Sequence, residues 1–145
     1  MKPERKIIND RLWEFANKLD ELNTNIKMYD ILLKDLENPL RATSYDAVST
    51  PGGTGSTTET AVILRERYCK SIEECTRAKE KCMKEFEEYI SPLKFHCKQI
   101  LRAKYIDGLN ISKIAYKTNY SEQHTKLLLS QSQDELYRIY KDKTF

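Results

Sequence analysis

The stretch "IINDRLWEFANKLDELNTNIKMYDILLKDL", residues 7–36, decides the fold class of this 145-residue chain. Its apolar side chains recur in alternating steps of four and three residues, the spacing of a helix that packs along a partner helix. Pro3 suits the first turn of a helix, and Pro39 disfavours helix at Asn38. These signals predict one helix over residues 1–38. Its apolar seam consists of Ile8, Leu12, Phe15, Leu19, Leu22, Ile26, Tyr29, Leu33 and Leu36.

A second long helix is predicted over residues 58–90, after a flexible linker over residues 39–57 that is rich in Ser, Thr, Gly and Pro. Ser56 and Glu59 have the spacing of a capping box, which predicts that this helix starts beside them. Its seam is weaker and consists of Ala61, Leu64, Tyr68, Ile72, Cys75, Ala78, Cys82, Phe86 and Tyr89.

The two helices have similar lengths and are expected to pair in a coiled-coil-like manner. The linker permits an antiparallel hairpin within one chain, a parallel arrangement, or an exchange of helices between chains, and the sequence leaves these open. A two-helix layer has little core of its own, so we expect a homo-oligomer, with a dimer favoured.

The composition agrees with an all-α fold. Only four Gly and four Pro interrupt the chain, and 32% of the residues are charged, whereas a β-rich core needs apolar strands and frequent turns. No apolar run exceeds four residues, so we expect neither a membrane span nor a secretion signal, and a cytoplasmic location.

Neither a metal site nor a catalytic site is indicated. The four cysteines contain no C-x-x-C spacing and are expected to be reduced, structural thiols, and no cofactor is expected. The stretch from Gly52 to Gly55 lacks the Lys and the preceding strand of a phosphate-binding loop. We therefore do not expect an enzyme.

Residues 91–145 are predicted to form a module of three helices. Ser91 and Pro92 are typical of a helix start, and Gly108 suits the end of that helix. Asn110 is expected to cap a short helix from Ile111 to Thr118. A three-residue turn, Asn119 to Ser121, follows, and Ser121 caps a last helix that runs towards Tyr140. The inward positions of this last helix are predicted to be Thr125, Leu128 or Leu129, Ser132 and Leu136.

A short helix, a three-residue turn and a longer helix are typical of a helix-turn-helix, whose second helix enters the major groove of DNA. Gln123 could offer its amide to adenine, and Lys126 its ammonium group to guanine or phosphate. The candidate base-reading residues are Glu122, Gln123, His124, Lys126 and Leu127.

The charge of this region favours a polyanion as the partner. Residues 91–126 contain seven Lys and Arg against only Asp107 and Glu122. Double-stranded DNA is therefore the expected partner, with salt-sensitive binding. The candidate phosphate contacts are Lys98, Arg102, Lys104, Lys113, Lys117 and Ser121.

The stretch "LRAKYIDGLNISKIAYKTNYSEQHTKLLLSQSQDEL", Leu101 to Leu136, resembles the fourth region of RNA polymerase sigma factors, a helix-turn-helix that reads promoter DNA. The longer layout is similar to sigma-like phage transcriptional regulators of the ArpU and RinA kind. The resemblance implies a DNA-binding activator of phage late genes in a bacterial host cell. Lys113 stands where sigma-type modules usually carry an acidic residue.

Two other functions remain open. A phage terminase small subunit also couples a helix-turn-helix to helical oligomerisation. Alternatively, the C-terminal module binds protein only. The long seams could also provide a docking surface for RNA polymerase or another phage protein.

Overall fold

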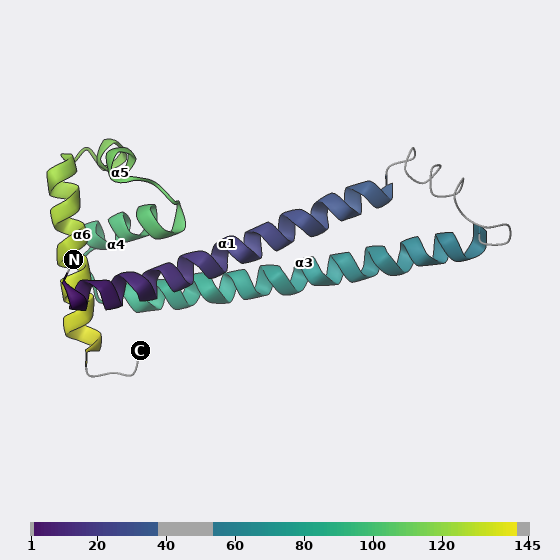
Figure 1. Ribbon diagram of the computed structural model, residues 1–145, viewed down its shortest axis with the longest axis horizontal. Helices are drawn as coiled ribbons and strands as arrows, with labels where there is room; N and C mark the ends of the chain where they lie inside the picture. Colours follow the sequence, from purple (N-terminus) through teal and green to yellow (C-terminus); the bar gives the residue numbers. More distant parts are fainter. Residues whose placement is uncertain (1, 38–53, 142–145) are drawn as a thin grey trace. The chain divides into compact units, whose positions relative to one another are not determined.

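The computed structural model describes residues 2–37 and 54–141, and this part of the chain is all-helical without a β-strand. The elements are α1 (Pro3–Glu37), α3 (Thr54–Ile90), α4 (Phe95–Leu101), a π-helical turn η1 (Arg102–Ile106), α5 (Ile111–Thr118) and α6 (Glu122–Tyr140) (Figure 1). The predicted all-α class is confirmed, and so is the first helix between Pro3 and Asn38. Within the described ranges, no helix combines the length and the apolar character that crossing a membrane requires.

The described residues fall into two compact units. The core unit contains residues 2–19 and 81–141, and the two-helix unit contains residues 20–37 and 54–80. This division differs from the predicted segments 1–38, 58–90 and 91–145. The start of α1 and the end of α3 belong with the C-terminal helices, because their seam residues are buried in one hydrophobic core with them.

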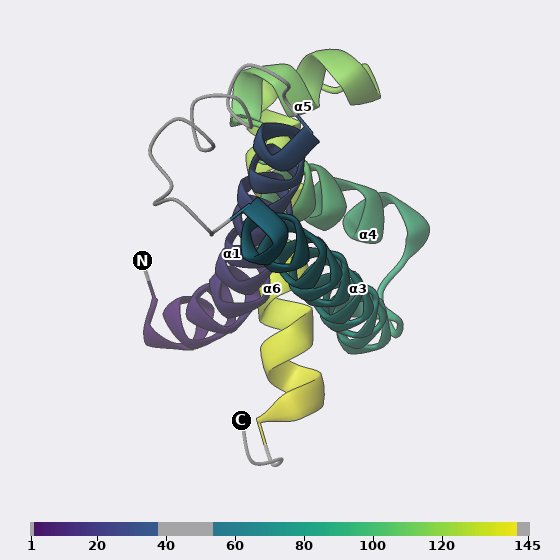
Figure 2. The same cartoon turned by 90° about the vertical axis from the view of Figure 1, so that its right-hand side faces the viewer.

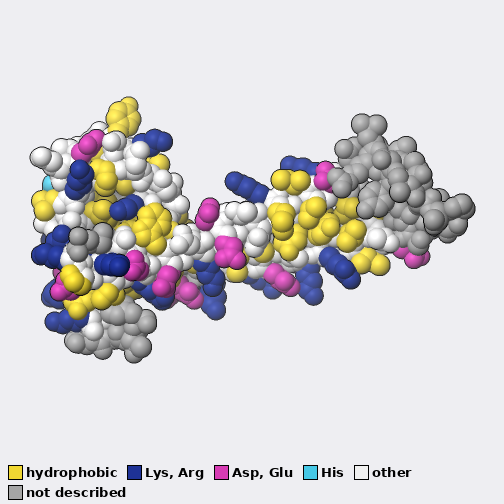
Figure 3. Space-filling model, viewed as in Figure 1, with side chains coloured by type: hydrophobic (Ala, Val, Ile, Leu, Met, Phe, Trp, Pro, Cys, Tyr) yellow, Lys and Arg dark blue, Asp and Glu magenta, His cyan; other side chains and the backbone are white. Residues whose placement is uncertain are grey.

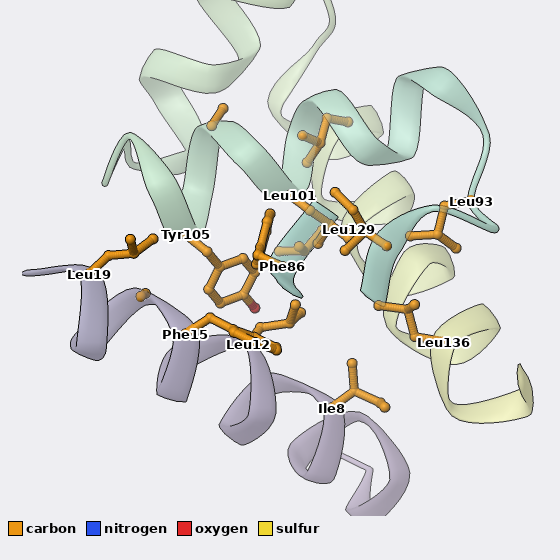
Figure 4. Packing of buried hydrophobic residues seen from close by; sticks show 14 of the residues in the cluster. Ile8, Leu12, Phe15, Leu19, Phe86, Leu93, Leu101, Tyr105, Leu129 and Leu136 are labelled. Carbon is orange, nitrogen blue, oxygen red and sulfur yellow. The ribbon is translucent and has the colours of Figure 1, made fainter. Parts of the chain in front are cut away.

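The core unit encloses its seam residues from all sides. Ile8 and Leu12 of α1 are fully buried, as are Phe86 of α3 and Leu101 of α4. Figure 4 shows them converging with the side chains of α6 on one cluster. The Phe15 and Phe86 rings meet edge-on, with centroids 5.8 Å apart, so α1 and α3 pair within one chain. Burying each such side chain contributes about 1.5–3 kcal/mol.

A short polar chain crosses this core. The Tyr105 hydroxyl donates to Asn9 Oδ1 at 2.6 Å and accepts from Gln133 Nε2 at 3.2 Å. Burial raises the pKa of Tyr105 to about 12. The chain thus connects α1, η1 and α6 through one phenol that stays protonated at neutral pH.

The two-helix unit has a thinner structure. Its helices contact each other along the predicted seams, for example through the Tyr29 and Tyr68 rings, whose centroids are 6.0 Å apart. Yet the seam residues Leu22, Ile26, Leu33 and Leu64 are only half-buried, and no described residue of this unit is fully buried. Two helices leave the outer side of every seam residue open, which explains this incomplete burial.

Two predicted helix starts are wrong. α3 begins at Thr54, so Ser56 lies inside the helix and is not its N-cap. The predicted linker residues from 39 to 53 lie outside the described residues. At the other end, α4 begins at Phe95 rather than at Ser91 and Pro92. The Ser91 hydroxyl donates to the Glu88 carbonyl at 2.7 Å, and the Leu93 N–H donates to the Ile90 carbonyl at 3.0 Å. These bonds close the end of α3, so Ser91 serves the preceding helix.

Candidate nucleic-acid interface

The short helix α5 is fixed at its start by the predicted cap. Gly108 has φ +69°, a left-handed conformation that glycine adopts without a steric penalty, and it turns the chain out of η1. The Asn110 side chain then accepts from the Lys113 N–H at 2.9 Å. Ile114 and Ala115 are buried as predicted, so the helix places the rest of its surface outward.

The turn between α5 and α6 has the predicted three residues. Asn119 has φ 61°, and the Tyr120 N–H donates to the Ala115 carbonyl at 3.1 Å, which closes α5 in a Schellman-type ending. Ser121 caps α6, because its hydroxyl oxygen accepts from the His124 N–H at 3.0 Å. As a result, α5 lies beside the N-terminal end of α6 (Figures 1 and 2).

The inward side of α6 is also as predicted. Thr125 and Ser132 are fully buried, and each hydroxyl donates to a carbonyl one turn earlier, at 2.9 Å and 2.7 Å. Of the two leucines left open, Leu129 is the buried one. Gln133 is buried as well and was missed, because a polar residue gives no apolar signal. With these residues inside, the first turns of α6 present their other side outward.

All five candidate base-reading residues lie on this outward side. The side chains of Gln123 and Lys126 make no hydrogen bond or ion pair with any residue that the structure describes, and Leu127 is 52% exposed. Glu122 is held instead, since the Ser112 hydroxyl donates to its carboxylate at 2.8 Å and so links α5 to α6. The edge of the His124 ring lies against Tyr120, with centroids 4.9 Å apart.

Lys113 and Lys117 of α5 are the best placed of the candidate phosphate contacts. Both are exposed and lie one helical turn apart, on the same face. The Lys117 ammonium lies 3.7 Å from Asp107, a weak surface contact, and Lys113 has no ion pair within the described ranges. These two cations are therefore accessible to a ligand.

The other candidate phosphate contacts are partly buried or already bonded to other groups of the protein. Arg102 donates through Nε to Glu87 at 2.6 Å, and this hydrogen-bonded pair lowers the pKa of the Glu87 carboxyl. The Lys104 ammonium lies over the Tyr105 ring at 5.4 Å, and burial lowers its pKa. Lys98 is half-buried, and the Ser121 hydroxyl is occupied as a cap. These four side chains are therefore already bonded or partly buried, whereas Lys113 and Lys117 are exposed.

Tyr116 was missed by the sequence reasoning. It is 88% exposed on α5, three residues after Lys113 and directly before Lys117. The three side chains share one helical face, because residues three and four apart are neighbours on a helix. Because Ile114 and Ala115 are predicted to face inward, the same helical spacing predicts that Tyr116 faces outward with these two lysines.

A metal centre has no support in the described residues. They contain no group of three or more His, Cys, Asp or Glu that could hold a metal ion. The four cysteines are free thiols, of which Cys82 is buried and Cys69 is exposed, and burial raises the pKa of the Cys82 thiol. The aromatic and histidine side chains near α6 instead contact each other, as in the 2.9 Å hydrogen bond between the Tyr120 hydroxyl and His96 Nδ1.

The two helices α5 and α6 thus pack against each other, and α6 carries five outward residues while α5 carries two exposed lysines. No protein-family model, curated protein or solved structure matches this chain.

Proposed function

We propose that this protein binds double-stranded DNA through α5, the turn and the start of α6, and regulates transcription. One observation carries the proposal: Gln123, Lys126 and Leu127 face outward at the start of a well-capped helix, and α5, which packs against that helix, exposes Lys113 and Lys117. This is the arrangement in which a helix-turn-helix presents its second helix to the major groove.

Each of these side chains has a suitable chemical role. The Gln123 amide can bind adenine with two hydrogen bonds, and Leu127 can contact a thymine methyl group. Lys126 can bind guanine or phosphate. Lys113 and Lys117 fit phosphates, which position the helix without reading sequence. The N-terminal end of α6 adds a partial positive charge next to the backbone of the DNA.

The resemblance to sigma region four supports transcription as the process concerned. On that basis we propose a sigma-like phage regulator that activates late genes, with RNA polymerase as a second partner. Mapping the bound DNA in a host genome, combined with a reporter gene, tests this part of the proposal. Binding confined to phage packaging sites would favour a terminase small subunit instead.

DNA binding itself is tested by fluorescence anisotropy with duplexes selected from random sequence. We expect the Lys113→Glu/Lys126→Glu variant to weaken binding and to reduce the salt slope by about two, since each lost phosphate contact removes close to one unit. The charge-matched control is Lys27→Glu/Lys81→Glu, which changes two exposed lysines outside α5 and α6. Equal binding by both variants would contradict the assignment of this interface.

A protein partner is the second candidate, because the same surface exposes apolar groups. Tyr116 is 88% exposed and Leu127 is 52% exposed, and exposed aromatic side chains are typical of protein interfaces. This function predicts no shift of any duplex at low salt. It also predicts capture of one specific polypeptide that the Tyr116→Ala variant fails to capture.

A further inference from the structure

The two-helix unit exposes large apolar side chains on helices that already pair with each other. Met28 is 47% exposed and Ile31 is 58% exposed on α1, while Ile63 is 50% exposed on α3. None of the described residues of this unit is fully buried, although both seams are apolar along their length. Figure 3 shows hydrophobic side chains gathered on the visible face of this pair of helices.

The two flanks of the α1 seam differ in chemistry. One flank is charged and consists of Lys27, Asp30, Lys34 and Glu37, with a 3.2 Å ion pair between Lys34 and Asp30. Such exposed pairs one turn apart suit a solvated surface. The other flank consists of Glu21, Thr24, Asn25, Met28, Ile31, Leu32 and Asp35, so its large apolar side chains lie between two acidic residues. Only this second flank extends the apolar seam sideways, so it marks the side on which a further layer can pack.

The area of this side is sufficient for a specific interface. Two adjacent helices of this length present a face about 30 Å long and about 20 Å wide, or about 600 Å². Two such faces together bury about 1,200 Å², the lower end of the range for stable protein interfaces. A four-helix layer of this kind would also enclose the seam residues that two helices leave half-open.

The charges favour a second copy of the chain in one particular arrangement. Residues 20–37 of α1 contain two Lys against five Asp and Glu, whereas residues 59–80 of α3 contain five Lys and Arg against five Glu. Packing α1 against α1 of another copy would bring two acidic helices together. Packing α1 against α3 of the other copy brings Glu21 and Asp35 of the packing flank next to the face of α3 that carries Ile63, Arg67 and Lys70.

We infer that the two-helix units of two copies pack face to face through the flank of Met28 and Ile31, with each α1 against the partner's α3. The result is a four-helix dimer. This inference is independent of DNA binding, because it rests on the two-helix unit and uses no residue of α5 or α6.

The test is the mass of the full chain in solution, measured by sedimentation equilibrium or light scattering at micromolar concentration. We expect twice the 17.1 kDa chain mass. Met28→Lys/Ile31→Lys is expected to raise the dissociation constant of the dimer about a hundredfold, since it removes two apolar side chains from the interface. Ile7→Lys is the matched control. It makes the same kind of change on the same helix, at a side chain that is 44% exposed in the core unit.

Each outcome decides for or against the inference. A dimer that the Lys variant dissociates and the Ile7→Lys variant retains supports it. A monomeric wild type, a larger ring, or a Lys variant that dimerises normally overturns it. If circular dichroism shows that the Lys variant loses helix, Met28→Ala/Ile31→Ala replaces it, because alanine favours helix and still removes the apolar contact.

Discussion

The core unit and the two-helix unit share two helices, α1 and α3, and a sequence pattern, but they differ in burial. Along α1, the same seam of steps of three and four places Leu12 in full burial and leaves Leu33 only half-buried. The pattern is equally regular at both positions, so it is not what separates them. The difference lies in what packs on the outer side: α4, η1 and α6 complete the core unit, whereas the two-helix unit has only α1 and α3. A seam thus determines which side chains turn inward, and the number of layers determines how much each of them stabilises.

The largest effect is expected from truncating one leucine in each unit. Leu12→Ala should reduce the free energy of unfolding by about 3 kcal/mol, because it leaves a cavity in a closed core. Leu33→Ala should cost about 1 kcal/mol, since water already reaches part of that side chain. Urea denaturation followed by circular dichroism measures both. Both variants are measured at protein concentrations low enough for the chain to be monomeric, and equal losses under these conditions would contradict the contrast between the units.

Removing one hydroxyl group tests the polar part of the same contrast. Tyr105→Phe should cost about 2 kcal/mol, because it leaves the buried Gln133 amide without its acceptor. Tyr29→Phe is the matched control in the two-helix unit, where the phenol has no hydrogen bond with a described residue. Its effect on the melting temperature should be close to zero. If Tyr105→Phe left the stability unchanged, the Gln133 amide would have another acceptor in the variant.

A smaller effect is expected from the backbone. Gly108→Ala should cost about 1 kcal/mol, because alanine pays a penalty at φ +69° even though open space surrounds the site. Ser71→Ala, within the uninterrupted α3, should be neutral or slightly stabilising, because alanine has the higher helix propensity. Thermal unfolding of the two variants measures the difference. Destabilisation by both would point to side-chain contacts rather than to backbone conformation.

The smallest effect concerns an ion pair at the surface of the core unit. Glu87→Gln should cost about 0.5 kcal/mol or less at pH 7, because both side chains of its pair with Arg102 are more than a third exposed. The pKa of Glu87 is lower in the folded state, so its contribution is complete above the ordinary value of 4.5 and is lost as the pH falls through the lower folded value. The difference between Glu87→Gln and the wild type should therefore narrow under acidic conditions. Asp30→Asn breaks the more exposed pair with Lys34 and serves as the control.

Local signals predicted the candidate interface well. Asn110 and Ser121 cap their helices because a side-chain oxygen three residues before an N–H needs no distant partner. The inward positions of Thr125, Ser132 and Leu136 follow from helical spacing, whereas the structure was needed to choose Leu129 over Leu128. Gln123 and Lys126 lie on the other side of the helix from these inward positions, so their outward orientation follows.

Tertiary packing decided the rest. Ser91 has the chemistry of a cap, but its hydroxyl reaches back to Glu88 and closes α3. The π-helical turn η1 has no signature in the sequence. The Asp107 N–H donates to the Arg102 carbonyl, five residues earlier, so this turn contains one residue more than an α-helical turn. Both Ala103 and Tyr105 are buried in the core. Glu87 lies fifteen residues before Arg102, beyond the range of any helical spacing, so the engagement of Arg102 could be seen only in the structure.

The hydrogen bonds at Tyr105 have a direction, because a phenol carries a single proton. The Gln133 amide donates to the phenol, and the phenol donates to Asn9, so the three groups are polarised from α6 through η1 to α1. A slide of α1 by one residue would place Ile8 or Asp10 where Asn9 accepts the proton. An aliphatic side chain there would leave the Tyr105 O–H without an acceptor, and burying a carboxylate there would cost the desolvation of its charge. The alignment of the first helix is therefore constrained by this hydrogen bond in addition to the apolar residues of its seam.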